Sequence, residues 1–146
     1  MKYVLDSSAA LPWVLPENDS AKAIRRDDAR HGVHELLAPD LFPAEVFNAL
    51  LKAERTQRIN VGEAKPLYAS IGADIPALHP YLPLMPRAGE IASRHRVALY
   101  DCLYIALAER ESCEVITADQ GIISLQTQLS FIGSKRGRES DFKLPS

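Results

Sequence analysis

The sequence has only two cysteines, and their positions exclude the usual structural roles of this residue. Cys102 and Cys113 are eleven residues apart on or near one expected helix. At a rise of ~1.5 Å per residue, this spacing separates them by roughly 16 Å. A disulfide needs Cα atoms within about 7 Å of each other, so we expect no bridge between them. The spacing also differs from the C-x-x-C pattern of a zinc site.

Long apolar runs are missing as well. No segment approaches the ~18 consecutive apolar residues of a membrane span. The N-terminus leads into a strand-like segment that ends at Asp6, which differs from the apolar region of a signal peptide. We therefore expect a cytoplasmic protein without a membrane role.

Glycine-rich phosphate-binding loops are also absent, since the chain contains neither a P-loop nor the G-x-G-x-x-G pattern. Binding of a nucleotide cofactor therefore has little support. The formal net charge is −2, which neither requires nor excludes nucleic acid, because a local basic patch is what binds phosphate.

The length of 146 residues fits one domain, because a chain of this size buries roughly 70% of its unfolded surface. A hydrophobic fraction of 47% with 25% charged residues is ordinary for a globular protein. We expect a compact domain over residues 1–132, followed by a polar tail over residues 133–146.

Strand-like and helical segments alternate along this domain, which indicates an α/β fold with a central, mostly parallel sheet and helices on both faces. Short strands are expected at 2–5, 36–38, 77–78, 114–117 and 131–132. Helices are expected at 7–14, 18–30, 41–58, 62–72, 86–95, 101–112 and 119–127.

Four carboxylates occupy positions that suit a metal-dependent nuclease. Asp6 and Asp119 each follow an expected strand, and ligands of parallel sheets bind in the crevice beyond the carboxyl ends of the strands. Asp101 opens an apolar helix, and Glu45 lies on another helix. Clustered carboxylates repel one another and normally stay ionised only around a cation. Oxygen donors favour Mg²⁺ or Mn²⁺, whereas zinc would favour histidine or cysteine.

Each acid also has a simpler interpretation. Asp6 and Asp101 are suitable helix N-caps, and Asp119 precedes Gln-Gly in a sequence typical of a turn. Glu45 lies almost opposite the apolar stripe of its helix, so it could be a solvated glutamate; that stripe contains Val46, Phe47, Leu50 and Leu51.

Basic side chains recur on the helix that carries Glu45. Lys52, Arg55 and Arg58 could contact the phosphates of a nucleic acid. The simpler alternative is a solvated helix face whose charges pair with nearby Glu54.

Segments 3–11, 43–50, 100–108 and 116–119 resemble, in order and wording, the motifs of PIN-domain ribonucleases of the VapC toxin type. The resemblance implies a PIN-like fold and a Mg²⁺- or Mn²⁺-dependent endoribonuclease that cleaves RNA through metal-activated water. If the metal ligands of the family are assigned to the matching positions of this sequence, the resemblance implies that Asp6 and Asp101 are the main metal ligands. The remaining site residues would be Glu45 and Asp119, completing the acidic site, and Thr117 and Ser8, as supporting hydroxyls.

The same resemblance implies two protein partners. Toxins of this kind pair with a small antitoxin that covers the acidic cleft, and the toxin commonly forms a homodimer.

Two other functions remain open from the sequence. A phosphotransfer or receiver-like domain also places carboxylates around Mg²⁺ at strand ends, although Ser8 stands where the haloacid-dehalogenase pattern needs a second aspartate. A catalytically inactive PIN-like RNA-binding module would typically have lost some of the acids, whereas all four are present here.

Overall fold

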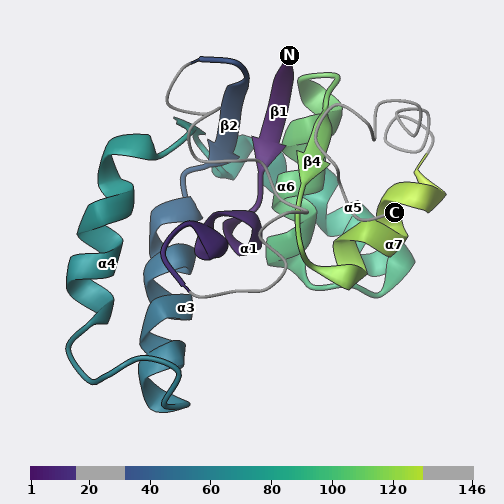
Figure 1. The fold of residues 1–146 in the computed structure, drawn as a ribbon. Coiled ribbons are helices and arrows are strands. Elements are labelled where there is room, and N and C mark those ends of the chain that lie inside the picture. Colours follow the sequence, from purple (N-terminus) through teal and green to yellow (C-terminus); the bar gives the residue numbers. More distant parts are fainter. Residues whose placement is uncertain (16–31, 130–146) are drawn as a thin grey trace.

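The computed structural model describes residues 1–15 and 32–129, which form a four-stranded parallel sheet surrounded by helices (Figure 1). The strand order is β3-β2-β1-β4. The strands are β1 (Lys2–Leu5), β2 (Glu35–Pro39), β3 (Ala77–His79) and β4 (Glu114–Ile116). The predicted α/β class and parallel sheet are therefore confirmed.

The helices lie close to their predicted positions. They are α1 (Ser7–Ala10), α3 (Phe42–Arg55), α4 (Ala64–Ile71), α5 (Met85–His95), α6 (Leu99–Arg110) and α7 (Gln120–Gln128). Short 3₁₀ turns occupy Leu11–Trp13, Gly72–Asp74 and Leu82–Leu84. The helix predicted at 18–30, the strand predicted at 131–132 and the tail at 133–146 lie outside the described residues.

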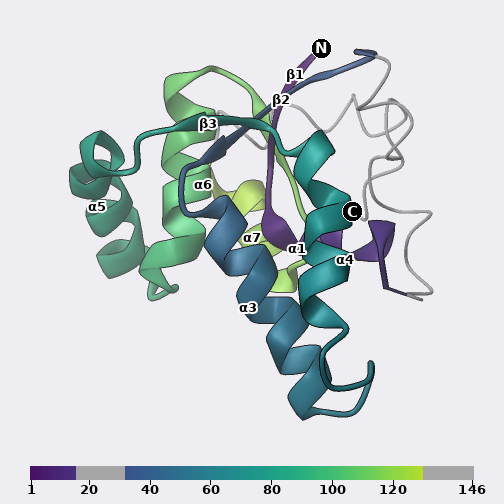
Figure 2. The same cartoon turned by 90° about the vertical axis from the view of Figure 1, so that its left-hand side faces the viewer.

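The core forms between the sheet and α6. Tyr3, Val4 and Leu5 of β1 are all buried, as expected for a parallel strand with both faces covered. Helix α6 packs across β1, β2 and β4 and is buried from Cys102 to Ala108. In Figure 2, α5 and α6 lie on one side of the strands and α4 lies on the other. Layers of this kind hold the ends of β1 and β4 in fixed positions.

The buried face of α3 differs from the predicted stripe. Its buried residues are Phe42, Val46, Leu50 and Ala53, whereas Leu51 is 38% exposed. Helix α3 packs against both α1 and α4, and these contacts rotate its buried face away from Leu51. At about 100° per residue, Glu45 then lies on the flank of the buried face and not opposite it.

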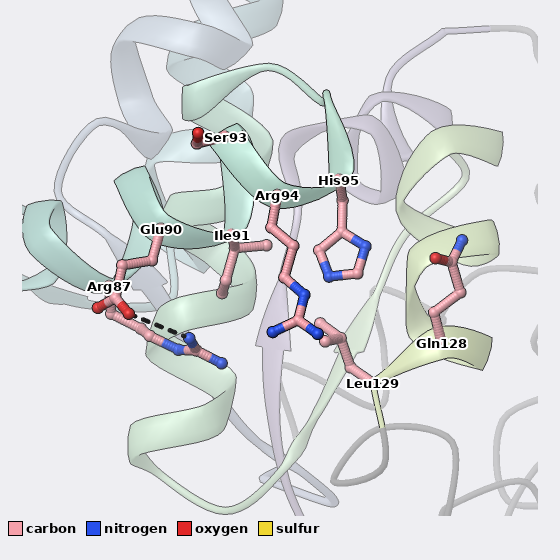
Figure 3. Close-up of a pocket in the computed structure, with 8 residues that line it drawn as sticks. All are labelled: Arg87, Glu90, Ile91, Ser93, Arg94, His95, Gln128 and Leu129. Carbon is pink, nitrogen blue, oxygen red and sulfur yellow. Dashed lines mark ion pairs between the residues drawn. The ribbon is translucent and has the colours of Figure 1, made fainter.

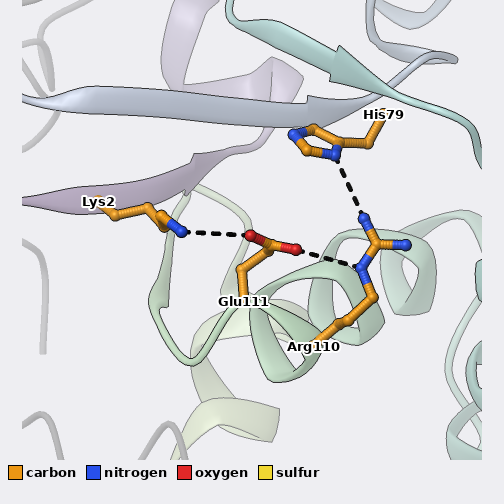
Figure 4. A network of polar contacts seen from close by, with 4 residues as sticks. All are labelled: Lys2, His79, Arg110 and Glu111. Atoms are coloured by element: carbon orange, nitrogen blue, oxygen red, sulfur yellow. Dashed lines mark hydrogen bonds and ion pairs between the residues drawn. The ribbon is translucent and has the colours of Figure 1, made fainter.

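The C-terminal end of α6 is tied to two strands by a chain of polar contacts (Figure 4). Glu111 accepts from Lys2 Nζ of β1 at 3.2 Å and from Arg110 Nε at 3.2 Å. Arg110 Nη2 reaches His79 Nδ1 of β3 at 3.2 Å. Exposed pairs of this kind contribute little energy singly, on the order of 0–1 kcal/mol, but they fix the register of α6 against the sheet.

Both cysteines are free and buried, which confirms that no disulfide joins them. Among residues 1–15 and 32–129, no helix has both the length and the apolar character needed to cross a membrane.

Candidate active site

The carboxyl ends of β1 and β4 bring the first two acids together. The two strands are parallel neighbours, with Leu5 opposite Ile116, and the Asp6 amide donates to the Ile116 carbonyl at 2.9 Å. Asp6 follows β1 directly, and Asp119 lies three residues beyond β4 at the start of α7. The predicted adjacency of the two strand ends is therefore present.

Two hydroxyl groups hold the buried Asp6 carboxylate. Ser8 Oγ and Thr117 Oγ1 both donate to Asp6 Oδ2, the latter at 2.9 Å. Each hydroxyl also accepts from a backbone amide: Ser8 from Ala118 at 3.0 Å, and Thr117 from Asp119 at 2.9 Å. This network satisfies a carboxylate that is only 5% exposed and joins α1 to the segment after β4. Ser8 and Thr117 thus stand where supporting hydroxyls were predicted.

Glu45 reaches the site from α3 and is held by an unexpected partner. Its side chain is half-buried, and Glu45 Oε1 accepts a hydrogen bond from the hydroxyl of Tyr104 on α6. The simple interpretation of Glu45 as a solvated glutamate is therefore wrong. The cause is the rotated buried face of α3, which turns this residue toward α6.

Asp101 and Asp119 differ in their relation to a helix terminus. Asp101 lies in the first turn of α6, but the N-cap is Ala98 and no side chain caps that helix. Asp119 does cap α7, because its Oδ1 accepts from the Ile122 amide at 3.1 Å. The capping role considered for Asp101 is therefore wrong, and Asp119, which the sequence suggested only as a turn residue, caps a helix.

Mutual repulsion affects the protonation of the acids. Burial is the main cause of the raised pKa of Asp6, Glu45 and Asp101. Nearby carboxylates raise these pKa values further: Asp119 acts on Asp6, while Asp6 and Asp101 act on Glu45. The pKa of Asp101 reaches about 6, with Asp119 and Asp6 as the charged contributors. All four acids thus share one electrostatic environment.

The negative charge of this group has no cationic partner in the described part of the chain. None of the lysine, arginine or histidine side chains there forms an ion pair with Asp6, Glu45, Asp101 or Asp119. The donors are carboxylate and hydroxyl oxygens, which suit a hard divalent cation. In residues 1–15 and 32–129, no three His, Cys, Asp or Glu side chains lie close enough together to hold one ion. An ion here would therefore need water for much of its coordination.

The predicted basic residues lie further along α3. Lys52 and Arg55 are exposed in its last turns, and Arg58 is exposed just after it. Lys52 follows Glu45 by seven residues, so the two share one side of the helix, about 10 Å apart along its axis. This geometry would let a polymer that reaches the acids also contact the basic side chains.

Two residues of this region were not singled out by sequence reasoning. Tyr104 lies in an apolar run, where an aromatic side chain is most simply interpreted as core, and Ser7 begins a short helix. The signal that could have identified Tyr104 is its spacing of three residues from Asp101, which places both on one face of α6.

A cavity of about 520 Å³ lies away from the acids, between α5 and α7 (Figure 3). Its lining includes Arg94, His95 and Leu129, and none of the four acids contributes to it. The four acids are therefore not part of this cavity.

Comparison with known proteins gives consistent results. Residues 3–126 match the family model described as the PIN domain. Ribonuclease VapC3 of Pyrobaculum aerophilum is 33% identical over 122 residues, covering 82% of this chain and 91% of that protein. VapC ribonuclease Mb0985 of Mycobacterium bovis is 27% identical over 116 residues, covering 80% and 84%. The crystal structure of PAE2754 from P. aerophilum superimposes with a TM-score of 0.63 at 20% identity, covering 92% of this chain and 99% of that one. These matches confirm the PIN-like fold.

Replacement of Asp101 by asparagine is expected to stabilise the protein in EDTA at about pH 7.5. The folded state raises the pKa of Asp101 from 3.8 to about 6. Between these two pH values, the folded protein therefore holds a proton that the unfolded chain has released. Stability is therefore lost as the pH rises from about 4 to about 6, and Asp101→Asn removes this loss. After allowance for solvent screening of a partly exposed side chain, the gain should be about 1 kcal/mol, or roughly 2–4 °C in Tm.

Thermal unfolding across this pH range checks the expectation. The difference between Asp101→Asn and the wild type should shrink as the pH approaches 4. Glu90→Gln, which removes an exposed carboxylate of α5, should show no such pH-dependent gain. Equal melting temperatures for wild type and Asp101→Asn at about pH 7.5 would show that burial and the neighbouring carboxylates do not raise the pKa of Asp101.

Proposed function

The chain belongs to the PIN-domain family, and from this membership we propose that it is a VapC-type toxin that cleaves RNA with the help of a divalent cation. The observation that carries the proposal is the group of four acids described above. Asp6, Glu45, Asp101 and Asp119 come from four different elements, share one electrostatic environment and have no cationic partner among the described residues. A group of this kind is most simply balanced by a bound divalent cation, which can in turn attract a negatively charged phosphodiester.

Mg²⁺ or Mn²⁺ fits the donor chemistry. Asp6 and Asp101 would be the main ligands, and Glu45 and Asp119 would complete the site directly or through water. Mg²⁺ keeps several waters and uses few protein carboxylates, in agreement with acids that are near one another without forming a closed cluster. When bound, such an ion neutralises charge at a phosphodiester and makes water a better nucleophile.

The side chains would prepare the site for this chemistry. Ser8 and Thr117 fix the Asp6 carboxylate from one side, and the Ile122 amide holds Asp119 by one oxygen. Because these donors are already in place, little reorganisation would be needed when the cation and substrate arrive. No nucleophilic side chain is required.

The basic side of α3 would hold the RNA backbone. Lys52 and Arg55 continue from Glu45 toward the far end of the helix, and Arg58 lies just beyond that end. Contacts of lysine and arginine with phosphates position a nucleic acid without reading its sequence. This proposal separates binding by α3 from cleavage at the acids.

Cleavage of total RNA by purified, partner-free protein tests the proposed activity. We expect discrete products in Mg²⁺ or Mn²⁺ and none in EDTA. Asp101→Asn should lower the rate by more than the about 10–100-fold that follows loss of a hydrogen-bond partner of a metal ligand. Glu90→Gln is the matched control and should cleave as the wild type does. Products that persist in EDTA, or an unchanged rate in Asp101→Asn, would refute the proposal.

Charge reversal on α3 tests the RNA-binding role. Lys52→Glu, Arg55→Glu and Arg58→Glu together, in an Asp101→Asn background, should weaken RNA binding. The slope of log K against log salt should fall in magnitude by about 2, at ~0.7 for each lost contact with single-stranded RNA. The control is an equal charge reversal elsewhere, at Lys65, Arg94 and Arg96. If the affinity and the salt slope matched those of this control, the role assigned to α3 would be abandoned.

A cognate antitoxin and a homodimer complete the proposal. The relatives named VapC support a small protein partner that covers the acidic site. Pull-down of the tagged protein from its native host should recover this partner and a second copy of the chain. Recovery of no small protein, with the neighbouring reading frame shown to be expressed, would count against the antitoxin.

A further inference from the structure

Tyr104 is the one fully buried tyrosine whose hydroxyl contacts an acid of the proposed site in the described part of the structure. The side chain is 0% exposed, in the middle of the apolar helix α6. A phenylalanine would fill the same space without a polar group to satisfy. The hydroxyl instead donates to Glu45 Oε1, which joins α6 to α3 at the point where the acids meet.

The surroundings of this hydroxyl keep it a donor. A phenol is protonated at neutral pH, and the Glu45 carboxylate beside it accepts a hydrogen bond from it. Ser7, at the start of α1, lies beside this phenol. The neighbouring Ser8 differs from Ser7 in that it donates directly to an acid, Asp6.

The contact leaves the second oxygen of Glu45 available. Glu45 Oε2 accepts no hydrogen bond from any of the residues the structure describes. Asp119 is held in a comparable way, with Oδ1 bound by the Ile122 amide. In both carboxylates, one oxygen is fixed by a donor of the protein, and the other accepts from none of residues 1–15 and 32–129.

We propose that Tyr104 is a positioning residue, whose hydroxyl anchors Glu45 through Oε1 so that Oε2 is turned, through water, toward the divalent cation that Asp6 and Asp101 would hold. This inference rests on the proposed function, since it assigns Glu45 a role toward that cation. A glutamate has three side-chain torsions, and one anchored oxygen removes most of that freedom before the ion binds. Hydrogen-bond partners of metal ligands typically contribute about 10–100-fold in metal affinity.

Mn²⁺ binding measured by isothermal titration calorimetry on the full chain tests the role without relying on RNA cleavage. Tyr104→Phe keeps the ring and removes only the anchoring hydroxyl, and we expect it to weaken Mn²⁺ binding about 10–100-fold. Glu45→Gln should weaken it at least as much. In the double variant Tyr104→Phe/Glu45→Gln, the second change should add little, because both act through the same carboxylate.

Tyr3→Phe is the matched control, because Tyr3 is a second buried tyrosine on the sheet and is 1% exposed. It should leave the Mn²⁺ affinity unchanged even if it lowers the melting temperature. If Tyr104→Phe fails to fold, Ser7→Ala replaces it, and a smaller loss of affinity in the same direction is expected.

The outcomes separate the two proposals. Wild-type affinity in Tyr104→Phe, with Mn²⁺ bound by the wild type, would overturn the positioning role alone. Additive losses in the double variant would also overturn it, since Tyr104 would then act elsewhere than through Glu45. A folded wild type that binds no Mn²⁺ would overturn the proposed cation site, and the role of Tyr104 with it.

Discussion

The rest of this structure is arranged around one constraint, the grouping of Asp6, Glu45, Asp101 and Asp119 at a site where acids are partly removed from water. Burial and mutual charge raise the pKa of the first three, so keeping these acids close costs folding energy. The described residues offset part of this cost with neutral donors and not with cations. Two hydroxyls donate hydrogen bonds to Asp6, a tyrosine hydroxyl donates to Glu45, and a backbone amide donates to Asp119. Neutral donors orient the carboxylates while leaving their charge available to a ligand.

The parallel sheet makes this arrangement possible. Neighbouring β1 and β4 end at the same edge, so Asp6 and the Thr117–Asp119 segment come together without long loops. Helix α6 packs across three strands and carries Asp101 and Tyr104 on one face. At its other end, Glu111 and Arg110 are tied to β1 and β3. A helix fixed at both ends can hold a charged side chain at the site with little positional freedom.

Much of this was predictable from the sequence because it depends on local pattern. The apolar run before Asp6 predicts β1, the run before Thr117 predicts β4, and a parallel sheet then requires their ends to meet. The buried helix beginning near Asp101 was predictable for the same reason. Four acidic motifs in order were enough to identify the family before any coordinates.

The remainder depends on tertiary packing, which periodicity does not contain. The apolar stripe predicted for α3 included Leu51, and this stripe wrongly placed Glu45 on the solvent side of the helix. In the structure, α3 packs against α1 and α4 with a different face, which brings Glu45 to Tyr104. The role of Tyr104 could not be recognised from the sequence, since a single tyrosine in an apolar helix is usually an ordinary core residue. Asp101 resembled a cap because its first-turn position is acidic, yet the N-cap is Ala98. In each case the three-dimensional neighbour, and not the local sequence, decides the role.

The most direct test of the account is the anomalous difference map from a crystal of the protein grown or soaked with Mn²⁺. The account predicts a peak among the four acids, within about 2.0–2.6 Å of carboxylate oxygens of Asp6 and Asp101, with waters in the remaining positions. A well-ordered site without a peak, or Mn²⁺ bound only elsewhere on the surface, would contradict the claim that these acids are arranged to hold a divalent cation.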